Sequence, residues 1–367
     1  MTEISQDGRS WPHREDCRIR TGPIAEVLDE ELLGSIPTSQ LLLRDSGVDA
    51  AALDPLRSIL ARRAALIERV VPGGAACKSP ESWQQILQIF AEVGLDRGGL
   101  VVVAGGGSVG DACAFAASVW HRGVPWIAIP TTLLAMVDAH IGGKTAIHLG
   151  GIKNRIGSFH LPRAVVSDRA MLESLPLSER AMGWAELIKA AWIGDPQLLE
   201  SLEQSSDSIP VDLIPRSEHL AQAVAVKVAI VDQDPFEKGP RERLNFGHTL
   251  GHALEMLSSP TMPHGEAVAR GMVFAARLAE QIGEASDGTA VRLATLLQRA
   301  SLPTDCSGIG LESLLETLQG DKKTRAGQLR WVIPRRPGEM VVRPVAIEVV
   351  ERVLRFPPLE AIVNPLT

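Results

Sequence analysis

The sequence contains no tyrosine, and aromatic residues make up only 4% of its 367 residues. Whatever chemistry the chain performs, a tyrosine cannot serve as its acid or base. Cysteine is also scarce: the four cysteines are widely spaced, without the C-x-x-C pair that marks many redox and zinc motifs. The N-terminal stretch MTEISQDGRSWPHRED has no apolar signal region. Together these features favour a reducing, cytoplasmic location.

Long apolar runs and an excess of basic residues are missing as well. The most apolar window, residues 124–137, is too short to cross a bilayer and contains two prolines, so we expect no membrane segment. The net charge of -7 argues against nucleic acid as a partner, because polyanion binding depends on clustered lysine and arginine. Any phosphate that the chain binds therefore has to meet a local group of cations.

The apolar residues that are present follow two different periods. Residues 1–22 are polar without periodicity, and we expect a flexible N-terminal arm there. Over 23–175, short apolar runs alternate with helical stretches, which is the rhythm of βαβ units on a parallel sheet. Over 176–367 amphipathic helical windows dominate, although LRWVIPRRPGEMVVRP could form a β-hairpin. The predicted architecture is an α/β, Rossmann-like N-terminal domain followed by an all-α C-terminal domain.

A glycine-rich turn lies between an apolar run and a helical stretch in LVVVAGGGSVGDACAFAASVW. Backbone N–H groups at the start of such a helix are free to bind a phosphate, so a dinucleotide could bind at Gly106 and Gly107. The spacing is not a strict G-x-G-x-x-G, and the alternative is a plain tight turn. Thr131 and Thr132 end the next predicted strand, at the edge where open α/β sheets bind ligands, which favours the cofactor interpretation.

Three histidines in the helical half suggest a metal site. His248 and His252 are four residues apart and project from one face of a helix, and His264 begins another helix in PHGEAV. Thr249 follows His248, so the glutamate of a zinc protease H-E-x-x-H is missing. An earlier helix offers Glu186 with Lys189. Each histidine alone could be an ordinary buried or capping residue, but together with the glutamate they favour a catalytic Zn²⁺ site.

Positive charge is concentrated in and around a second glycine-rich segment, VDAHIGGKTAIHLGGIKNRIG. Such a segment permits close approach of a small anion to the backbone. Taken one at a time, each of these charged side chains is more often a solvated surface group than a ligand-binding one. The spacing in the sequence does not show which cations converge. The candidates in and beyond the segment are Asp138, Lys144, Lys153, Asn154, Arg122, Lys227, Arg241, Lys322 and Lys323.

These motifs, taken in order from about residue 70 to 330, resemble the 3-dehydroquinate synthase family of sugar phosphate cyclases. The stretches that carry the resemblance are GGGSVGD, RGVPWIAIPTTLLAMVDAHIGGKT, KNRIGSFHLP, AELIK, LNFGHTLGHALE, PHGEAV and GDKKTRAGQLR. The resemblance implies a Rossmann-like NAD-binding domain, a helical domain that binds metal and substrate, an active site in the cleft between them, and a homodimer. It also implies NAD as cofactor and Zn²⁺ as the metal, with Co²⁺ as the alternative.

The resemblance assigns roles to individual residues. It implies that Glu186, His248 and His264 hold the metal, and that His252 contacts substrate, whereas spacing alone would pair His248 with His252. Residues that match substrate-binding positions are Asp138, Lys144, Asn154, Lys189, Lys227, Arg241, Asn245, His252, and one or both of Lys322 and Lys323. Arg122 matches an arginine that reaches the phosphate of the neighbouring subunit. Residues that match cofactor-binding positions are Lys78, Gly106, Gly107, Asp111, Thr131, Thr132, Lys153 and Glu179.

The chain departs from the family's pattern at two places. Ala75 stands where the family's P-x-G-E-x-x-K motif has glutamate, which removes one expected cofactor contact. His148 stands where the family usually has asparagine, and LGGIKN replaces the commoner P-x-GKN. Both of these latter changes lie in the expected substrate loop and bear on which sugar phosphate is used.

The resemblance implies a reaction in several steps without net redox change. The substrate, 3-deoxy-arabino-heptulosonate 7-phosphate, is transiently oxidised by NAD, loses phosphate, is reduced again, and closes by an intramolecular aldol reaction to 3-dehydroquinate. Retention of Arg241, Leu244, Asn245 and His252 favours this substrate or its 4-amino analogue over sedoheptulose 7-phosphate or glucose 6-phosphate. Two other classes stay open: an NAD- and metal-dependent alcohol dehydrogenase, and a sugar phosphate binding protein that has lost its cofactor.

Overall fold

The computed structural model describes residues 2–6, 17–204, 208–258, 260–305, 310–320 and 328–355. The chain forms two compact units, and each is built from two separate segments. Unit 1 comprises Met1–Arg180 and Ile214–Pro235, and unit 2 comprises Ala181–Leu213 and Phe236–Thr367. The chain therefore leaves unit 1, enters unit 2, and returns to unit 1 for one helix before it completes unit 2.

Unit 1 is built on a seven-stranded sheet with the order β1-β2-β9-β6-β5-β3-β4. Strand β1 runs antiparallel to β2, and the other neighbours are parallel. The central strands are apolar and buried along their whole length, as expected for a parallel sheet covered on both faces. The strands are β1 (Thr2–Gln6), β2 (Cys17–Thr21), β3 (Gln40–Asp45), β4 (Leu66–Val71), β5 (Leu100–Gly105), β6 (Trp126–Pro130) and β9 (Ala164–Ser167).

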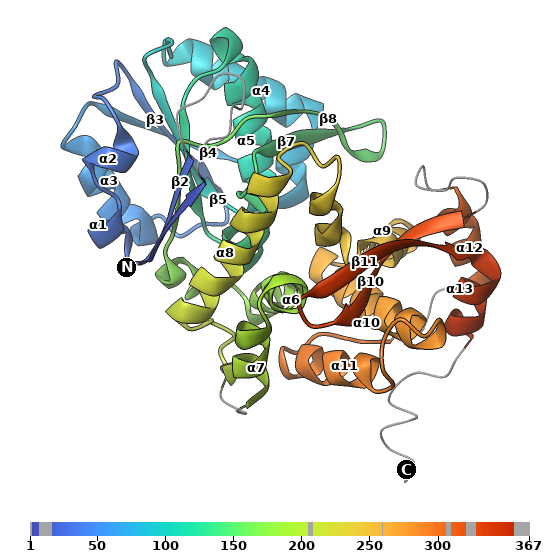
Figure 1. Ribbon diagram of the computed structural model, residues 1–367. Helices are drawn as coiled ribbons and strands as arrows, with labels where there is room; N and C mark the ends of the chain where they lie inside the picture. Colours follow the sequence, from blue (N-terminus) through green and yellow to red (C-terminus); the bar gives the residue numbers. More distant parts are fainter. Residues whose placement is uncertain are drawn as a thin grey trace. The chain divides into compact units, whose positions relative to one another are not determined.

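Helices cover both faces of this sheet (Figure 1). Right-handed crossovers place α1, α2 and α3 on one face and α4 and α5 on the other. The helices of unit 1 are α1 (Ile24–Val27), α2 (Glu30–Leu33), α3 (Asp54–Ala61), α4 (Pro80–Glu92), α5 (Gly107–Val119) and α8 (Ser217–Gln233). Short helical turns are η1 (Ala51–Leu53), η2 (Gly74–Lys78), η3 (Trp120–Arg122), η4 (Ala135–Ala139) and η5 (Arg169–Leu172).

The sheet reverses its winding direction between β3 and β5. The chain leaves β3 toward β4 at one edge, whereas it leaves β5 toward β6 and β9 on the opposite side. Open α/β sheets bind their ligands at the carboxyl ends of the strands beside such a reversal. This topology places the glycine turn, which follows β5, at the expected ligand-binding edge.

A two-stranded ribbon, β7 (Lys144–Leu149) and β8 (Ile152–Phe159), extends unit 1 beyond the main sheet (Figure 1). Its register pairs Lys144 with Phe159 and Ile147 with Ile156. Ile147 is buried, and β7 packs on α5. Nearly all of β8 is exposed. The ribbon thus has a packed base and a solvent-exposed outer strand.

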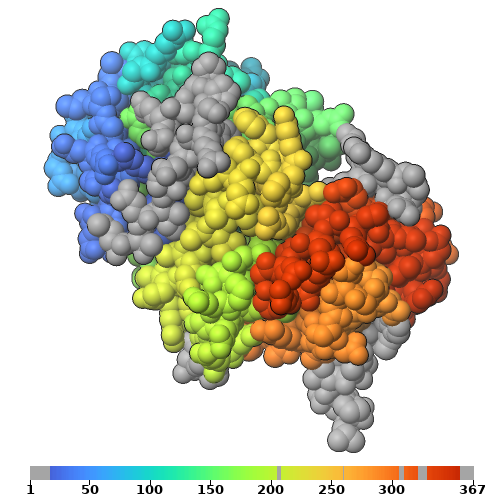
Figure 2. All heavy atoms as spheres, viewed as in Figure 1, coloured from blue at the N-terminus to red at the C-terminus, as the bar shows by residue number. Residues whose placement is uncertain are grey.

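Unit 2 is mainly helical and contains one antiparallel hairpin. In the described residues its elements are α6 (Leu177–Gly194, which begins in unit 1), α7 (Pro196–Gln204), η7 (Pro240–Asn245), α9 (His248–Leu257), α10 (His264–Gln281), α11 (Thr289–Arg299), α12 (Leu311–Gln319), β10 (Gln328–Arg336), β11 (Glu339–Ala346) and α13 (Ile347–Leu354). Strands β10 and β11 form the β-hairpin that the stretch LRWVIPRRPGEMVVRP was expected to allow. Within unit 2 it borders the segment that contains α10 and α11 at the surface in Figure 2.

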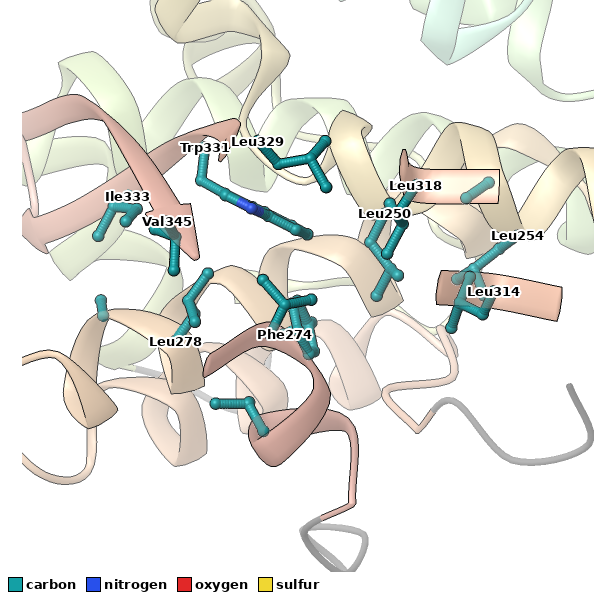
Figure 3. Close-up of a cluster of buried hydrophobic side chains, with 14 of the residues drawn as sticks. Leu250, Leu254, Phe274, Leu278, Leu314, Leu318, Leu329, Trp331, Ile333 and Val345 are labelled. Carbon is teal, nitrogen blue, oxygen red and sulfur yellow. The ribbon is translucent and has the colours of Figure 1, made fainter. Parts of the chain in front are cut away.

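The core of unit 2 joins this hairpin to helices α9, α10 and α12 (Figure 3). Trp331 of β10 is 1% exposed and lies 5.3 Å, centroid to centroid, from Phe274 of α10. Leu250 and Leu254 of α9 complete the layer on the other side. Burying such large side chains stabilises a domain by about 1.5–3 kcal/mol each. The core therefore fixes the positions of α9 and α10, which carry the three histidines.

The structure differs from the expected flexible arm at residues 1–22. Strands β1 and β2 lie in that range, and Ile19 of β2 is fully buried. Arg18 and Arg20 make the segment look polar in the sequence, but Arg20 is only 5% exposed and is paired with Asp29 and Glu31. Partnered arginines can lie within a strand beside a buried core, and this explains the error.

The helical stretch HLAQAVAVKVAIV was expected in the helical C-terminal domain, but it lies in unit 1. It forms α8, which belongs to the α/β unit and packs on β1, β2 and η4. The amphipathic pattern predicts a helix, but it does not show which core the helix joins. Among the described residues, no helix is both long and apolar enough to cross a membrane.

Candidate active site

Three residues of unit 2 converge as a possible metal site. Each of Glu186, His248 and His264 offers a ligand atom, and these atoms all lie within 4.8 Å of one another. The Nε2 atoms of His248 and His264 lie 3.7 and 3.5 Å from the same Glu186 oxygen, Oε1. Two imidazoles and one carboxylate are the donor set of many catalytic zinc sites, and three protein ligands leave a position for substrate. The residues therefore fit a divalent metal ion.

Close helix packing brings these ligands together. Glu186 comes from α6, His248 is the first residue of α9, and His264 is the first residue of α10. Gly265 lies so close to α6 that a Cβ there would come within 2.5 Å of the Met182 Cα atom. Only glycine permits this approach, because real Cβ contacts are longer. The site thus depends on the small residue that directly follows one of its ligands.

Charges around the triad shift the pKa values of its histidines in opposite directions. Burial, followed by the positive charge of Lys189, lowers the pKa of His248 well below its usual range. Burial also lowers the pKa of His264, but hydrogen bonds to Glu186 and Glu255 outweigh it and raise the pKa to about 9. Lys189 forms an ion pair with the second oxygen of Glu186, Oε2. The position between Glu186 and His264 therefore favours a positive charge.

Other predicted substrate residues of unit 2 lie on the elements that carry the triad or next to them. His252 is exposed on α9, with its ring 5.4 Å from that of His248, and it is outside the group of three ligands. Asn245 ends η7, and its side-chain amide donates to Glu237 at 3.2 Å. Arg241 of η7 is 2% exposed. Lys189 is buried one turn after Glu186.

In unit 1, four of the predicted cofactor residues lie at the carboxyl ends of β5 and β6. Gly106 is the N-cap of α5 and Gly107 is its first residue, so the free N–H groups of this helix face the end of the sheet. Thr131 follows β6 and donates its N–H to the Gly105 carbonyl at 3.1 Å. The Thr132 hydroxyl accepts from the Ala135 N–H at 3.2 Å. This arrangement matches a phosphate-binding helix N-terminus.

Lys78 connects the glycine turn to the β7–β8 ribbon. Its ammonium pairs with Asp111 of α5 and also donates to the Asn154 side-chain oxygen at 2.6 Å. Lys78 is 5% exposed. Burial raises the pKa of Asp111 to about 6, although the Lys78 charge opposes this shift. The His148 ring accepts the Asn154 backbone N–H at 3.1 Å, so the histidine that departs from the family pattern holds a predicted substrate residue in place.

The remaining predicted residues are dispersed or lie outside the described part of the chain. Asp138 at the end of η4 pairs with Lys227 of α8, both in unit 1. The exposed ones are Lys144, Lys153, Arg122 and Glu179. Arg122 has a positive φ of 69° on η3. Lys322 and Lys323 fall outside the described residues.

The structure adds two residues that the sequence analysis did not identify. One lies beside the candidate metal site and the other beside Asp111. Glu255, 7% exposed on α9, places its Oε1 atom 3.4 Å from the His264 Nδ1 atom. His140 is 3% exposed, and it lines one small pocket with Asp111 and Lys144. A Cβ on Gly110 would overlap its ring. The motif HALE contains Glu255, but only the packing of α9 against α10 shows what it contacts.

Two family models match adjacent parts of the chain. The 3-dehydroquinate synthase N-terminal model matches residues 68–182, and the 3-dehydroquinate synthase C-terminal model matches residues 183–324. A 3-dehydroquinate synthase of Dehalococcoides mccartyi is 43% identical over 262 residues, which are 71% of this chain and 72% of that protein.

Solved structures show the same fold at lower identity. A 2-deoxy-scyllo-inosose synthase complexed with carbaglucose-6-phosphate, NAD⁺ and Co²⁺ has a TM-score of 0.83 and 23% identity, over 93% of this chain and 97% of that one. A 2-epi-5-epi-valiolone synthase from Streptomyces hygroscopicus with NAD⁺ and Zn²⁺ bound has a TM-score of 0.80 and 24% identity, over 95% and 98%. With its Rossmann-like sheet, its helical second unit and family models that match both halves, the chain belongs to the 3-dehydroquinate synthase family.

Proposed function

We propose that the chain converts 3-deoxy-arabino-heptulosonate 7-phosphate to 3-dehydroquinate and phosphate, with NAD and a divalent metal as cofactors. The observation that carries the proposal is the convergence of Glu186, His248 and His264 in a chain whose relatives at 43% identity are 3-dehydroquinate synthases.

The bound groups supply what the side chains of this chain cannot. When bound, NAD⁺ supplies a temporary hydride acceptor, and a divalent ion held by Glu186, His248 and His264 supplies a Lewis acid. The glycine turn at Gly106 and Gly107, at the N-terminus of α5, is the place for the cofactor's phosphates. Because the proposed reaction has no net redox change, NADH would not accumulate during turnover.

The chain's own residues bind and orient the substrate. Lys144 begins β7 and Asn154 lies on β8; the cation and the amide each offer a hydrogen-bond donor to a phosphate. Lys78 and His148 fix Asn154 from two sides. In unit 2, Lys189, Arg241, Asn245 and His252 offer donors for the substrate's carboxylate and hydroxyl groups. Side chains held in place before binding reduce the cost of ordering a flexible sugar phosphate.

The test measures inorganic phosphate and NADH absorbance together. Purified protein with Zn²⁺ and NAD⁺ is given 3-deoxy-arabino-heptulosonate 7-phosphate, its 4-amino analogue, sedoheptulose 7-phosphate or glucose 6-phosphate in parallel. We expect phosphate release from the first substrate at constant NADH absorbance. Release only from another sugar would preserve the reaction type and overturn the substrate.

A dehydrogenase would give a different result in the same assay. It would accumulate NADH without releasing phosphate, and the phosphate-binding candidates Lys144 and Asn154 would have no task in it. A binding protein that has lost NAD would show neither signal but would still bind the sugar phosphate.

We also propose a cytoplasmic homodimer. Arg122 lies exposed on η3, which fits the family role of an arginine that reaches the phosphate in the neighbouring subunit. Sedimentation velocity of the active protein tests this proposal, and a fully active monomer at assay concentration would contradict it.

A further inference from the structure

The two histidines of the candidate metal site are held from behind by different chemical groups. The Nδ1 atom of His248 lies 3.1 Å from the Phe246 backbone carbonyl. The Nδ1 atom of His264 lies 3.4 Å from the Glu255 carboxylate. In both rings the opposite nitrogen, Nε2, faces Glu186. An acceptor at Nδ1 selects the tautomer whose Nε2 lone pair is available for a metal.

Glu255 is placed for this contact by the geometry of α9. It follows His248 by seven residues, which is two helical turns, so both side chains lie on the face of α9 that meets α10. Its neighbours Ala253 and Leu254 belong to the apolar core of unit 2. A carboxylate that is 7% exposed beside such a core is costly unless it is partnered. A structural role alone would be served more simply by an apolar side chain at this position.

We propose that Glu255 is a positioning residue for the metal: its carboxylate accepts the Nδ1 proton of His264, fixes the ring, and makes Nε2 a stronger ligand. This inference rests on the metal dependence proposed above. Carboxylate–histidine–metal arrangements of this kind contribute about 10–100-fold to metal affinity in other proteins. The Phe246 carbonyl gives His248 the equivalent support without a charge, so the two ligands differ in basicity.

The experiment measures metal binding directly. Apo protein is titrated with Zn²⁺ against a chromophoric chelator, and with Co²⁺ while the visible absorption spectrum is recorded. We expect Glu255→Ala to weaken Zn²⁺ affinity by about 10–100-fold. Glu255→Gln, which keeps an acceptor but no charge, should give a smaller loss and a shifted Co²⁺ spectrum. His264→Ala should lose the site.

The matched control is Glu280→Gln. Glu280 lies on the same helix as His264 and accepts the Ala290 N–H at 2.9 Å, so the substitution disturbs a helix-capping carboxylate without touching the triad. Its Zn²⁺ affinity should equal that of the parent. Thermal unfolding of all apo variants separates weaker binding from misfolding, and Glu255→Gln supports the comparison if the alanine variant is unstable.

Three results would overturn the proposal. One is a folded Glu255→Ala variant, or its glutamine counterpart, that binds Zn²⁺ within about twofold of the parent and leaves the Co²⁺ spectrum unchanged. Another is a parent protein that binds no Zn²⁺ at all, which overturns the metal site as well. A third is an equal loss of affinity in Glu280→Gln. A parent that binds Zn²⁺ through Glu255 but releases no phosphate would support the positioning role and overturn the proposed function alone.

Discussion

The metal-ligand triad of unit 2 and the β7–β8 ribbon of unit 1 are built in opposite ways. Glu186, His248 and His264 each come from a helix. Helices α9 and α10 share the apolar core of unit 2, and α6 lies close against Gly265 of α10. The ribbon has a mostly exposed outer strand, where Lys153 and Asn154 lie among exposed neighbours. The triad is therefore assembled by packing before any ligand arrives. The ribbon depends on a few polar contacts, chiefly those of Lys78 and His148 with Asn154.

This difference separates two tasks. A metal site needs ligand positions accurate to a few tenths of an ångström, which core packing supplies. A phosphate loop needs closely spaced donors and room for the anion to enter, and exposed segments with few buried contacts open at the lowest free-energy cost. Substitutions in the triad should therefore impair metal binding, whereas substitutions in the ribbon should impair phosphate binding.

The largest effects are expected from one substitution in the triad and one in the ribbon. Together they test whether metal binding and phosphate binding are separate tasks. His264→Ala should lose both Zn²⁺ binding and phosphate release, because a ligand is gone. Lys144→Ala should keep Zn²⁺ affinity and still lower phosphate release by about 10²–10³-fold, because an anion-stabilising cation is gone. Zn²⁺ titration and the phosphate assay are run on both variants.

The control for Lys144→Ala is Arg155→Ala on the neighbouring strand, which removes the same charge from an exposed position. Its phosphate release should stay within about twofold of the parent, as for surface charges in general. If Lys144→Ala also lost the metal, or if Arg155→Ala were equally inactive, the two regions would not be independent.

The sequence predicted the two regions unequally well. Its periodicity indicated the parallel sheet and the helical half, and the fold is confirmed, because buried strands and amphipathic helices follow from local pattern. The spacing of His248 and His252 placed both on one face of a helix. It could not show that Glu186 lies beside His248, since this depends on how α6 and α9 pack.

The features that the sequence did not predict correctly have one physical origin. Strand β2 looked like part of a polar arm because Arg18 and Arg20 alternate with its buried residues, and only Asp29 and Glu31 explain their place. Helix α8 was expected in the second domain, yet it packs on the sheet of unit 1. Glu255 has no signal of its own in the sequence. In each case a contact with another element decides the outcome, and local sequence pattern does not contain that information.

A smaller effect concerns His140 in unit 1. Burial lowers the pKa of His140 to about 4, so the folded protein keeps this ring neutral while the unfolded chain protonates it near 6.5. The unfolded state then binds more protons between these values, and stability falls as the pH drops from about 6.5 to 4, by about 3 kcal/mol from this group. Thermal unfolding across this range should show a weaker pH dependence for His140→Leu than for the parent.

Asp111 lines the same pocket and acts in the opposite sense, because its raised pKa lets the folded state take up a proton first. The informative quantity is therefore the difference in pH dependence between His140→Leu and the parent. His121→Gln, at an exposed position, is the control and should reproduce the parent's profile. An unchanged profile for His140→Leu would show that the buried ring does not govern acid stability.

The smallest effect is expected at η2, where the chain departs from its family. Ala75 is exposed three residues before Lys78, at the position where the family motif has glutamate. Ala75→Glu should restore a hydrogen bond to NAD⁺. A typical hydrogen bond contributes about 0.5–1.5 kcal/mol, so NAD⁺ should bind about 2–10-fold more tightly. Ala76→Glu adds the same charge to the next exposed residue and should not improve binding.

Fluorescence titration with NAD⁺ compares the affinity of Ala75→Glu with that of Ala76→Glu. Tighter binding in Ala75→Glu alone would show that position 75 lies within reach of the bound cofactor. Equal binding by both variants and the parent would mean that a glutamate at position 75 finds no partner on NAD⁺ in this chain.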